Sequence, residues 1–361
     1  MTICFTVTND LSYDQRMIRI CSSLIKAGYR VELIGRKLKK SVPLSQQPFR
    51  QKRISCVFEK GKFFYAEFNI RLFFYLLFKR SSCFCAIDLD TILPVLLCSK
   101  IRRIKRVYDA HELFCEMKEI VSRPKIYNAW KRIEKFSVPK FPNGYTVNRQ
   151  TAGEFKNMYG VDYGIIRSIA FKKHYSPAKK DETFILYQGA VNEGRSFETL
   201  IPAMHLVNAT LVIAGEGNFY EQAKLLVSDN ILDDKIIFKG YMDPAVLNEF
   251  TIEATIGLTL FDDQGLSNYY SLANRFFDYI QACVPQLCVN YPAYEEINKE
   301  FEVALLIDDL SSANIAKQLN LLLEDKELYD RLKENCLDAR EVYNWQNEEK
   351  KLIEFYRKLS V

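Results

Sequence analysis

The sequence of 361 residues lacks the features of a membrane-spanning, secreted or zinc-binding protein. Its longest apolar stretch, residues 63–78, is interrupted by Glu67, Asn69 and Arg71, so it is too short and too polar for a spanning helix. None of the ten cysteines has zinc-ligand spacing, and the chain starts with an apolar strand pattern rather than a secretory signal. We therefore expect reduced thiols and a cytoplasmic location.

The composition excludes disorder and coiled coil, because 48% of the residues are hydrophobic and 26% are charged. The length predicts two domains. Residues 1–180 carry 35 Lys and Arg against 14 Asp and Glu, a net charge of +21, whereas residues 181–361 carry 15 against 31, a net charge of −16. The two domains should therefore differ in electrostatic character.

Strand and helix patterns alternate along both halves of the chain, which predicts parallel sheets built from βαβ units. Strands are expected at 3–7, 31–34, 85–87, 106–109, 144–147, 184–188, 210–214, 236–239, 256–260 and 286–290. Helices of the second half are expected at 197–207, 219–229, 244–253 and 271–283. The fold class is therefore α/β, with two Rossmann-like doubly wound domains at 1–172 and 173–344, joined near 171–182. A final helix at about 345–361 can pack on either domain.

The most informative segment is the helix expected at residues 271–283. At 100° per residue its apolar positions share one side, while Asn274, Arg275 and Asp278 group on the other. An arginine near a helix N-terminus suits a phosphate, and a carboxylate one turn later suits the two hydroxyls of a ribose. The alternative is a solvated helix face with an Arg275–Asp278 ion pair.

Two glycine-containing loops follow predicted strands of the second half. The first contains Gly189 and delivers Arg195 just before a helix, so its backbone amides and one cation suit a diphosphate. The second contains Gly215 and Gly217, where the absence of side chains lets a flat base approach the backbone. Each loop alone is also common in α/β folds without such a ligand.

In the first half, strand ends carry ionisable residues. Asp109, His111 and Glu112 follow one strand, and Asp88 and Asp90 follow the preceding one. Ligands of open α/β sheets bind at the carboxyl ends of strands, which favours a functional role. The alternatives are a structural histidine and helix capping by the two aspartates.

Together these segments resemble the group 1 (family 4) retaining glycosyltransferases of the GT-B fold, of the bacterial surface-polysaccharide type. The resemblance covers nearly the whole chain and rests on four segments, residues 10–16, 88–91, 108–113 and 270–279. The last is the most specific, because Ser-Leu-Ala-Asn-Arg-Phe-Phe-Asp-Tyr is similar to the family's donor-site helix.

The resemblance implies two domains facing across a cleft that holds a UDP- or GDP-linked sugar. It implies that Arg195 and Arg275 neutralise the donor diphosphate and that Asp278 binds the ribose. Further donor-binding positions are Gly189, Gly215, Gly217 and Asn274. His111, with Asp109 and Glu112, is implied to be catalytic, and Asp14, Arg16 and Asp90 are implied to lie at the acceptor or domain interface.

The expected reaction is transfer of a sugar from the nucleotide to a glycan or lipid-linked glycan, with retention of configuration. No Asp-x-Asp lies near the donor motifs, so we expect neither a metal nor another cofactor, and cations and helix dipoles would stabilise the leaving group. Ala190 and Tyr270 replace the family's usual Arg and Glu, and the missing carboxylate would come from Asp262 or Asp263. A nucleotide-sugar 2-epimerase and a non-catalytic nucleotide- or lipid-binding paralogue therefore stay open as alternatives.

Residues 60–80 combine dense aromatics with basic flanks. This pattern suits a helix at the surface of an anionic inner leaflet, where a polyprenyl-diphosphate-linked acceptor would be found, and equally suits a core helix. Nucleic acid is not expected as a partner, because no recognition motif accompanies the basic charge.

Overall fold

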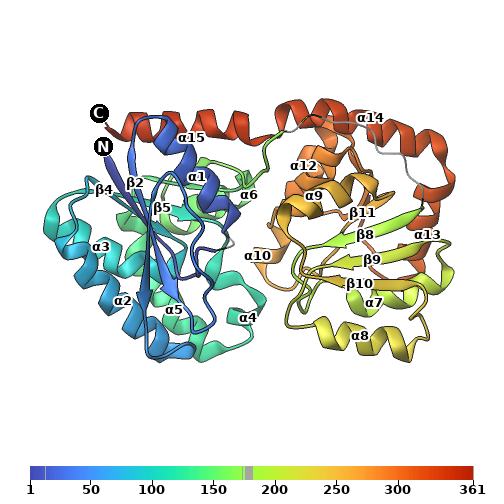
Figure 1. Cartoon of the computed structure of the whole chain (residues 1–361), viewed down its shortest axis with the longest axis horizontal. Helices are drawn as coiled ribbons and strands as arrows, with labels where there is room; N and C mark the ends of the chain where they lie inside the picture. The colour runs from blue at the N-terminus through green and yellow to red at the C-terminus, as the bar shows by residue number, and fades with distance from the viewer. Residues whose placement is uncertain (13, 173, 175–181, 361) are drawn as a thin grey trace. The chain divides into compact units, whose positions relative to one another are not determined.

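The computed structural model describes residues 1–12, 14–172, 174 and 182–360. These residues form two compact units, Met1–Ser168 with Glu348–Val361 and Ile169–Asn347 (Figure 1). Each unit is a parallel α/β sheet of the Rossmann type, which confirms the predicted fold class. The predicted joint at 171–182 lies largely outside the described residues, as does Tyr13 of the opening motif.

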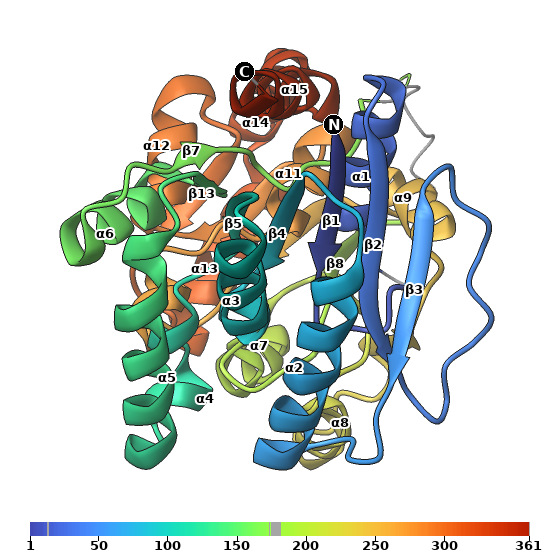
Figure 2. The ribbon, with the colours of Figure 1, turned by 90° about the vertical axis from the view of Figure 1, so that its left-hand side faces the viewer.

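The first unit is built on a seven-stranded parallel sheet in the order β3-β2-β1-β4-β5-β6-β7. Its strands are β1 (Thr2–Thr6), β2 (Arg30–Lys37), β3 (Arg50–Ser55), β4 (Cys83–Ile87), β5 (Lys105–Ala110), β6 (Gly144–Thr146) and β7 (Gly164–Ile165). Its helices are α1 (Gln15–Lys26), α2 (Gly61–Phe78), α3 (Ile92–Arg102), α4 (Lys118–Val121), α5 (Pro124–Ser137) and α6 (Arg149–Tyr159). Figure 2 shows α2, α3 and α5 together in front of this sheet.

The second unit is built on a six-stranded parallel sheet in the order β10-β9-β8-β11-β12-β13. Its strands are β8 (Phe184–Gln188), β9 (Thr210–Ala214), β10 (Ile236–Gly240), β11 (Ile256–Thr259), β12 (Gln286–Val289) and β13 (Ala304–Ile307). Its helices are α7 (Phe197–Ala203), α8 (Tyr220–Asp229), α9 (Pro244–Glu253), α10 (Leu266–Tyr269), α11 (Asn274–Ala282), α12 (Pro292–Phe301), α13 (Ser312–Glu324) and α14 (Lys326–Val342).

The apolar runs of the central strands explain why they form buried parallel sheets. All five residues of β8 are buried, with Ile185 and Tyr187 in one hydrophobic cluster and Phe184 and Leu186 in another. Alternate residues of the strand therefore face opposite layers of helices. Gln188, at the end of the strand, is the polar residue of β8.

The last helix, α15 (Trp345–Ser360), begins in the second unit, and its residues from Glu348 belong to the first. Its Tyr356 is fully buried and packs against the rings of Phe5, Tyr29 and Tyr145. The helix is thus part of the first unit's core rather than an appendage.

Some sequence expectations of the elements were wrong. Strands β3, β7 and β13 were not predicted, and β3 reads Arg-Gln-Lys-Arg-Ile-Ser, which is polar because it is an edge strand with little burial. The helix expected from residue 271 begins at Asn274, so Arg275 lies in its first turn. Within the described part of the chain, no helix is both long and apolar enough to cross a membrane.

Candidate functional site

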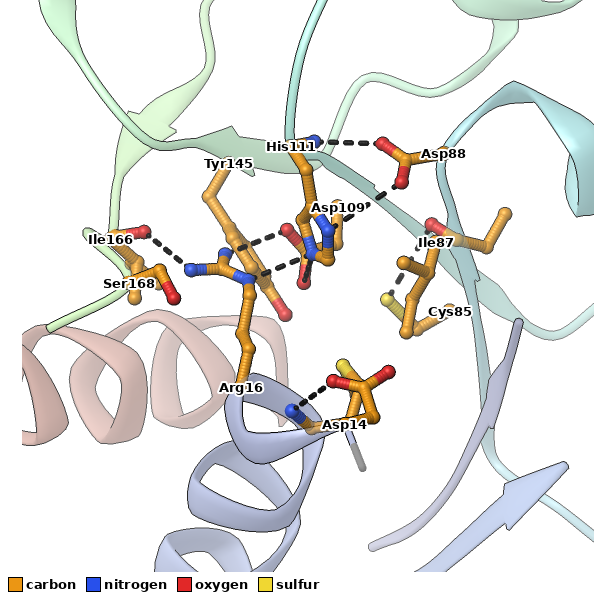
Figure 3. A network of polar contacts seen from close by, with 12 residues as sticks. Asp14, Arg16, Cys85, Ile87, Asp88, Asp109, His111, Tyr145, Ile166 and Ser168 are labelled. Atoms are coloured by element: carbon orange, nitrogen blue, oxygen red, sulfur yellow. Dashed lines mark hydrogen bonds and ion pairs between the residues drawn. The ribbon is translucent and has the colours of Figure 1, made fainter. Parts of the chain in front are cut away.

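In the first unit, three elements bring charged side chains together at the carboxyl ends of β4 and β5 (Figure 3). Arg16, from the first turn of α1, places Nη2 2.9 Å from Asp109 Oδ1 and donates from Nε to His111 Nε2 at 2.8 Å. Nη1 of the same guanidinium donates to the carbonyl oxygen of Ile166 at 3.2 Å. Arg16 and Asp109 are both buried, so this ion pair is shielded from water.

Asp88, at the end of β4, holds His111 from the other side. Its Oδ1 accepts the backbone N–H of His111 at 2.9 Å, and its Oδ2 lies 3.5 Å from Nδ1 of the imidazole. The backbone of Asp88 has a φ of 52°, a left-handed conformation that non-glycine residues rarely adopt. Such strain is found where the surroundings over-determine a functional geometry. Asp88 is not a side-chain helix cap, contrary to the alternative considered for it.

The pKa values in this cluster follow from burial and from the neighbouring charges. Burial opposes ionisation of Asp109, but Arg16 and His111 hold its pKa below the ordinary value. Burial alone would lower the pKa of His111, yet Asp109 and Asp88 raise it to about 9. The cluster therefore favours an anionic Asp109 beside a basic imidazole.

The hydrogen bonds define what protonation of His111 would change. Because Nε2 accepts from Arg16, it carries a lone pair, and the proton of the neutral ring is on Nδ1, toward Asp88. Asp109 Oδ2 accepts no hydrogen bond from the described residues, although it lies 3.3 Å from His111 Nε2. A proton on Nε2 would give this oxygen its partner and would break the contact with Arg16. His111 thus has a defined route for taking up and releasing one proton.

Two further carboxyl groups of the predicted site are held in a less ionised state. Burial and the charge of Asp88 raise the pKa of Asp90 to about 6 and that of Glu112 to about 8. Asp90 accepts a hydrogen bond from the hydroxyl of Thr8. Near neutral pH, Glu112 can therefore donate a proton where Asp109 can only accept one.

Asp14 has a structural role that the sequence prediction did not include. Its Oδ1 accepts the backbone N–H of Met17 at 2.9 Å and caps α1, which sets the position of Arg16 two residues later. The structure places Asp14, Arg16 and Asp90 in the first unit without testing their predicted role toward an acceptor.

In the second unit, Arg275 does not lie on a solvated helix face, so the alternative given for this helix is wrong for Arg275. The side chain is buried, with its guanidinium carbon 4.5 Å from the centroid of the Tyr187 ring. Nη1 donates to the backbone carbonyl of Gln188 at 3.1 Å, beside the backbone of Gly189. Arg275 thus lies in the first turn of α11, with its guanidinium at the carboxyl end of β8. Asn274, by contrast, is exposed.

Within the described residues, the N-terminus of α11 has no side-chain cap, although the N–H of Phe276 donates to the Ala273 carbonyl at 3.1 Å. Its cap residue, Ala273, has no side-chain group to accept the first N–H groups of the helix. These groups, the positive end of the helix dipole and the Arg275 guanidinium therefore occupy one end of the helix. This arrangement suits an anion.

The glycines of the two predicted loops are required by contacts of the loops with each other. A Cβ on Gly215, whose φ is 149°, would lie 1.8 Å from the carbonyl oxygen of Gly189. A Cβ on Gly217 would lie 2.2 Å from the carbonyl oxygen of Val191. The backbones of the loops after β8 and β9 thus pack directly together. This contact requires glycine at both positions, whereas the expected reason for these glycines was the approach of a base.

Polar contacts tie the remaining donor-site residues to the ends of β8 and β11. Asp278 accepts from the side-chain amide of Gln188 at 3.1 Å, and the other end of that amide accepts from the Thr251 hydroxyl at 2.7 Å. Arg195 lies over the Phe261 ring at 5.2 Å. Asp262, which follows Phe261 in the chain, donates its backbone N–H to the carbonyl of Gly194 at 3.0 Å. A carboxylate from the 262–263 segment is therefore close to the glycine loop.

Sequence reasoning missed Tyr187 and Gln188 as parts of this site and named no specific role for Asp88. Tyr187 supports Arg275 through its ring, and its hydroxyl donates to the carbonyl of Ala190 at 2.7 Å. The available signal was a polar residue, Gln188, at the end of a fully apolar strand. Among the described residues, no group of three or more His, Cys, Asp and Glu is arranged to hold a metal ion.

Comparison with protein families gives a match in the second unit. Residues 169–338 match the model of the group 1 glycosyl transferases, which covers nearly all of this unit and just under half of the chain. The match includes the β8 and β9 loops and α11. It supports the family resemblance drawn from the motifs. A search of curated protein sequences finds no significant match.

Solved structures with the same fold are glycosyltransferases of the GT-B type, which shows that both units have this fold. Sucrose-phosphate synthase from Thermosynechococcus elongatus has a TM-score of 0.80 at 16% identity, covering 99% of each chain. Anabaena HepE in complex with UDP-glucose has a TM-score of 0.77 at 11% identity, covering 99% of this chain and 100% of that one. WaaG, a glycosyltransferase involved in lipopolysaccharide biosynthesis, has a TM-score of 0.68 at 13% identity, covering 98% of each chain.

Proposed function

We propose that this protein is a glycosyltransferase that moves a sugar from a nucleotide-sugar donor to a glycan or lipid-linked glycan acceptor. The observation that carries the proposal is the family match of residues 169–338 together with the buried Arg275 at the uncapped start of α11. A nucleoside diphosphate needs a cation and backbone N–H groups of this kind. A protein of the same fold, HepE, is known in complex with such a donor, UDP-glucose.

The reaction replaces one bond at the anomeric carbon of the sugar by another. The bond from this carbon to the diphosphate oxygen breaks, and the bonding pair leaves with the nucleoside diphosphate. The acceptor hydroxyl oxygen forms the new glycosidic bond on the same face, with retention of configuration, and loses its proton. We assign stabilisation of the departing diphosphate to Arg275, Arg195 and the α11 N-terminus, without a metal.

The first unit supplies the groups that exchange protons in this proposal. His111, with its Nε2 between Arg16 and Asp109, and Glu112, whose pKa is raised to about 8, are the candidate catalytic residues. The acceptor is proposed to be a polyprenyl-diphosphate-linked glycan of surface polysaccharide or glycoconjugate synthesis, met at an anionic membrane surface. The strongly basic composition of the first half of the chain favours an anionic acceptor.

The test is transfer from a panel of UDP- and GDP-linked sugars to oligosaccharide and lipid-linked acceptors, with product configuration determined by NMR. We expect acceptor-dependent release of the nucleoside diphosphate, strongly reduced in Arg275→Gln and unchanged in Lys317→Gln, an exposed position on α13. Nucleotide release that needs no acceptor would contradict transfer and favour an epimerase. Loss of activity with a chelator and its rescue by a divalent cation would contradict metal independence.

A further inference from the structure

The outer surface of α2 and α3 exposes an unusual amount of apolar side chain. Four residues of one stripe of α2 are buried in the core, namely Phe64, Phe68, Leu72 and Leu76. A second stripe of α2 is exposed. Helix α3, which also exposes apolar side chains, lies beside α2 (Figure 2). The members of this α2–α3 surface are Phe63, Ile70, Phe74, Phe78, Leu97 and Ile101. Helix α2 thus belongs to the core on one side and exposes an apolar face on the other. The two interpretations of residues 60–80, a membrane-surface helix and a core helix, are therefore not exclusive.

Single side chains of the α2–α3 surface are exposed over a large fraction of their area. Phe78 is 81% exposed, and Phe63, Ile70 and Phe74 are each 57% or 58% exposed. Between the two helices runs a groove of about 260 Å³, and apart from Asn69 its lining is apolar: Ile70, Phe73 and Phe74 of α2 with Leu93, Pro94 and Leu97 of α3. A helix that is apolar all round is normally buried, so this face lacks a covering layer of low polarity.

The charges around the α2–α3 surface have one sign. Helices α2, α3 and α5 carry eight Lys and Arg but only two Glu. Glu67 is paired with Arg71 at 2.8 Å, and Glu134 is buried beside Lys131 at 2.8 Å. Neither glutamate therefore offsets the exposed cations, which are Lys62, Lys100, Lys125, Arg132 and Lys135.

A cavity of about 910 Å³ adjoins this surface at the C-terminal end of α2. Phe78 lines it together with Arg30, Arg50 and Arg80, three exposed arginines that make no side-chain hydrogen bond or ion pair with the described part of the chain. The one carboxylate of the cavity, Glu32, is neutralised by Lys79 and by the Tyr75 hydroxyl. The cavity thus combines an aromatic edge with unneutralised positive charge.

From these observations we infer that the α2–α3 surface docks on an anionic lipid bilayer, with lipid phosphate groups taken up by the arginine cavity. Apolar side chains flanked by cations are what an interfacial helix presents to such a membrane. The same surface of a second copy would bring the same positive charge and be repelled, which argues against a symmetric dimer through this surface. The inference deepens the proposed function, on which it rests for the lipid-linked acceptor.

The experiment measures sedimentation of the full chain with vesicles of phosphatidylcholine alone and with vesicles in which phosphatidylglycerol replaces a third of it. We expect at least tenfold stronger partitioning to the anionic vesicles, weakened by salt. The variant Phe74→Ser/Phe78→Ser and the variant Arg30→Gln/Arg50→Gln/Arg80→Gln should each lose at least tenfold. All five residues are exposed, so circular dichroism should show an unchanged fold.

Matched controls lie on the second unit. Leu206→Ser/Ile231→Ser removes two equally exposed apolar side chains, and Lys239→Gln/Lys317→Gln/Lys326→Gln removes three exposed cations. Both should bind vesicles as the parent chain does. Equal binding to both kinds of vesicle, or equal losses in the controls, would overturn the docking surface. The docking surface would also be overturned if the parent chain bound no vesicles and formed a dimer in light scattering that only Phe74→Ser/Phe78→Ser dissociated.

Transfer to a water-soluble acceptor, measured in parallel, separates the two proposals. Transfer without vesicle binding would refute the docking surface and leave the proposed function in place. Vesicle binding without transfer from any donor would support the surface and count against the enzyme.

Discussion

Replacement of Arg16 by methionine should destabilise the first unit strongly. Asp109 is fully buried and its nearest cation is Arg16, 2.9 Å away, so the variant leaves this carboxylate in the core with His111, 3.3 Å away, as its remaining cationic neighbour. Breaking a buried pair in this way costs about 3–5 kcal/mol of unfolding free energy. Removing both charges in Arg16→Met/Asp109→Asn should cost less than the two single changes together, by a coupling energy of about 2–3 kcal/mol.

The loss should also depend on pH in a defined direction. In the parent chain the pKa of Asp109 is lowered, so its stabilisation is present above the ordinary carboxyl pKa and lost only as pH falls through the lowered value. Without Arg16, burial dominates and the pKa of Asp109 rises above the ordinary value. The penalty of Arg16→Met should therefore be larger at about pH 8 than at about pH 5.

Urea unfolding followed by tryptophan fluorescence measures this effect in one unit. The chain has two tryptophans, Trp130 in the first unit and Trp345 in the second, so a Trp345→Phe background makes the signal report on the first. A cost of Arg16→Met below about 1 kcal/mol would refute the reasoning, since it would be typical of an exposed pair. Additive effects in the double variant would refute it as well.

Three further predictions concern single positions. Gly215→Ala should destabilise the second unit by about 2–4 kcal/mol, because its Cβ would meet the Gly189 carbonyl. The same unfolding assay measures this, now followed by the fluorescence of Trp345 in a Trp130→Phe background. Gly153→Ala, in open space on α6, should instead stabilise the first unit by about 0.5–1 kcal/mol. Equal effects of the two would contradict the packing of the loops. Glu112→Gln should leave the melting temperature unchanged near pH 5 and raise it above about pH 8. The reason is that burial raises the pKa of Glu112 to about 8, so the parent chain loses stability as pH rises from the ordinary carboxyl pKa to that value. A lower melting temperature at high pH would contradict this. Asp88→Asn should lower the pKa of His111 from about 9 toward its ordinary value in an NMR titration, where only three histidines contribute signals; an unchanged pKa would show that Asp88 does not act on the ring.

Sequence patterns predicted the elements whose burial is decided by local composition. The expected bounds of β8, β9 and α9 agree with the structure residue for residue, because each of the two strands has one polar end residue and is otherwise apolar, and the helix has an aspartate cap followed by proline. By contrast, β3 pairs at the sheet edge through its backbone, which its polar side chains do not reveal. Backbone pairing without an apolar pattern leaves little signal in a sequence.

In the candidate site, too, sequence patterns identified residues but not the contacts between distant parts of the chain. Residue types and motif positions identified Arg16, Asp109 and His111, which the structure brings within hydrogen-bonding distance of one another. Spacing on an ideal helix placed Arg275 on the polar side of the helix, whereas the side chain is buried against the end of β8. Contacts such as Arg275 with the Gln188 carbonyl join residues far apart in the chain and depend on how the sheet and helix pack.

Binding of nucleoside diphosphates by isothermal titration calorimetry tests the central claim, that Arg275 and the start of α11 hold a donor diphosphate. The titrations compare UDP, GDP and the corresponding nucleosides, with the parent chain, Arg275→Gln and the control Lys317→Gln. We expect one of the diphosphates to bind the parent and the control equally, and to bind Arg275→Gln about 10–100-fold more weakly, as loss of a charge-assisted hydrogen bond implies. The free nucleosides should bind weakly and should not respond to the substitution. Unchanged diphosphate affinity in Arg275→Gln, or equal losses for nucleoside and diphosphate, would contradict the account.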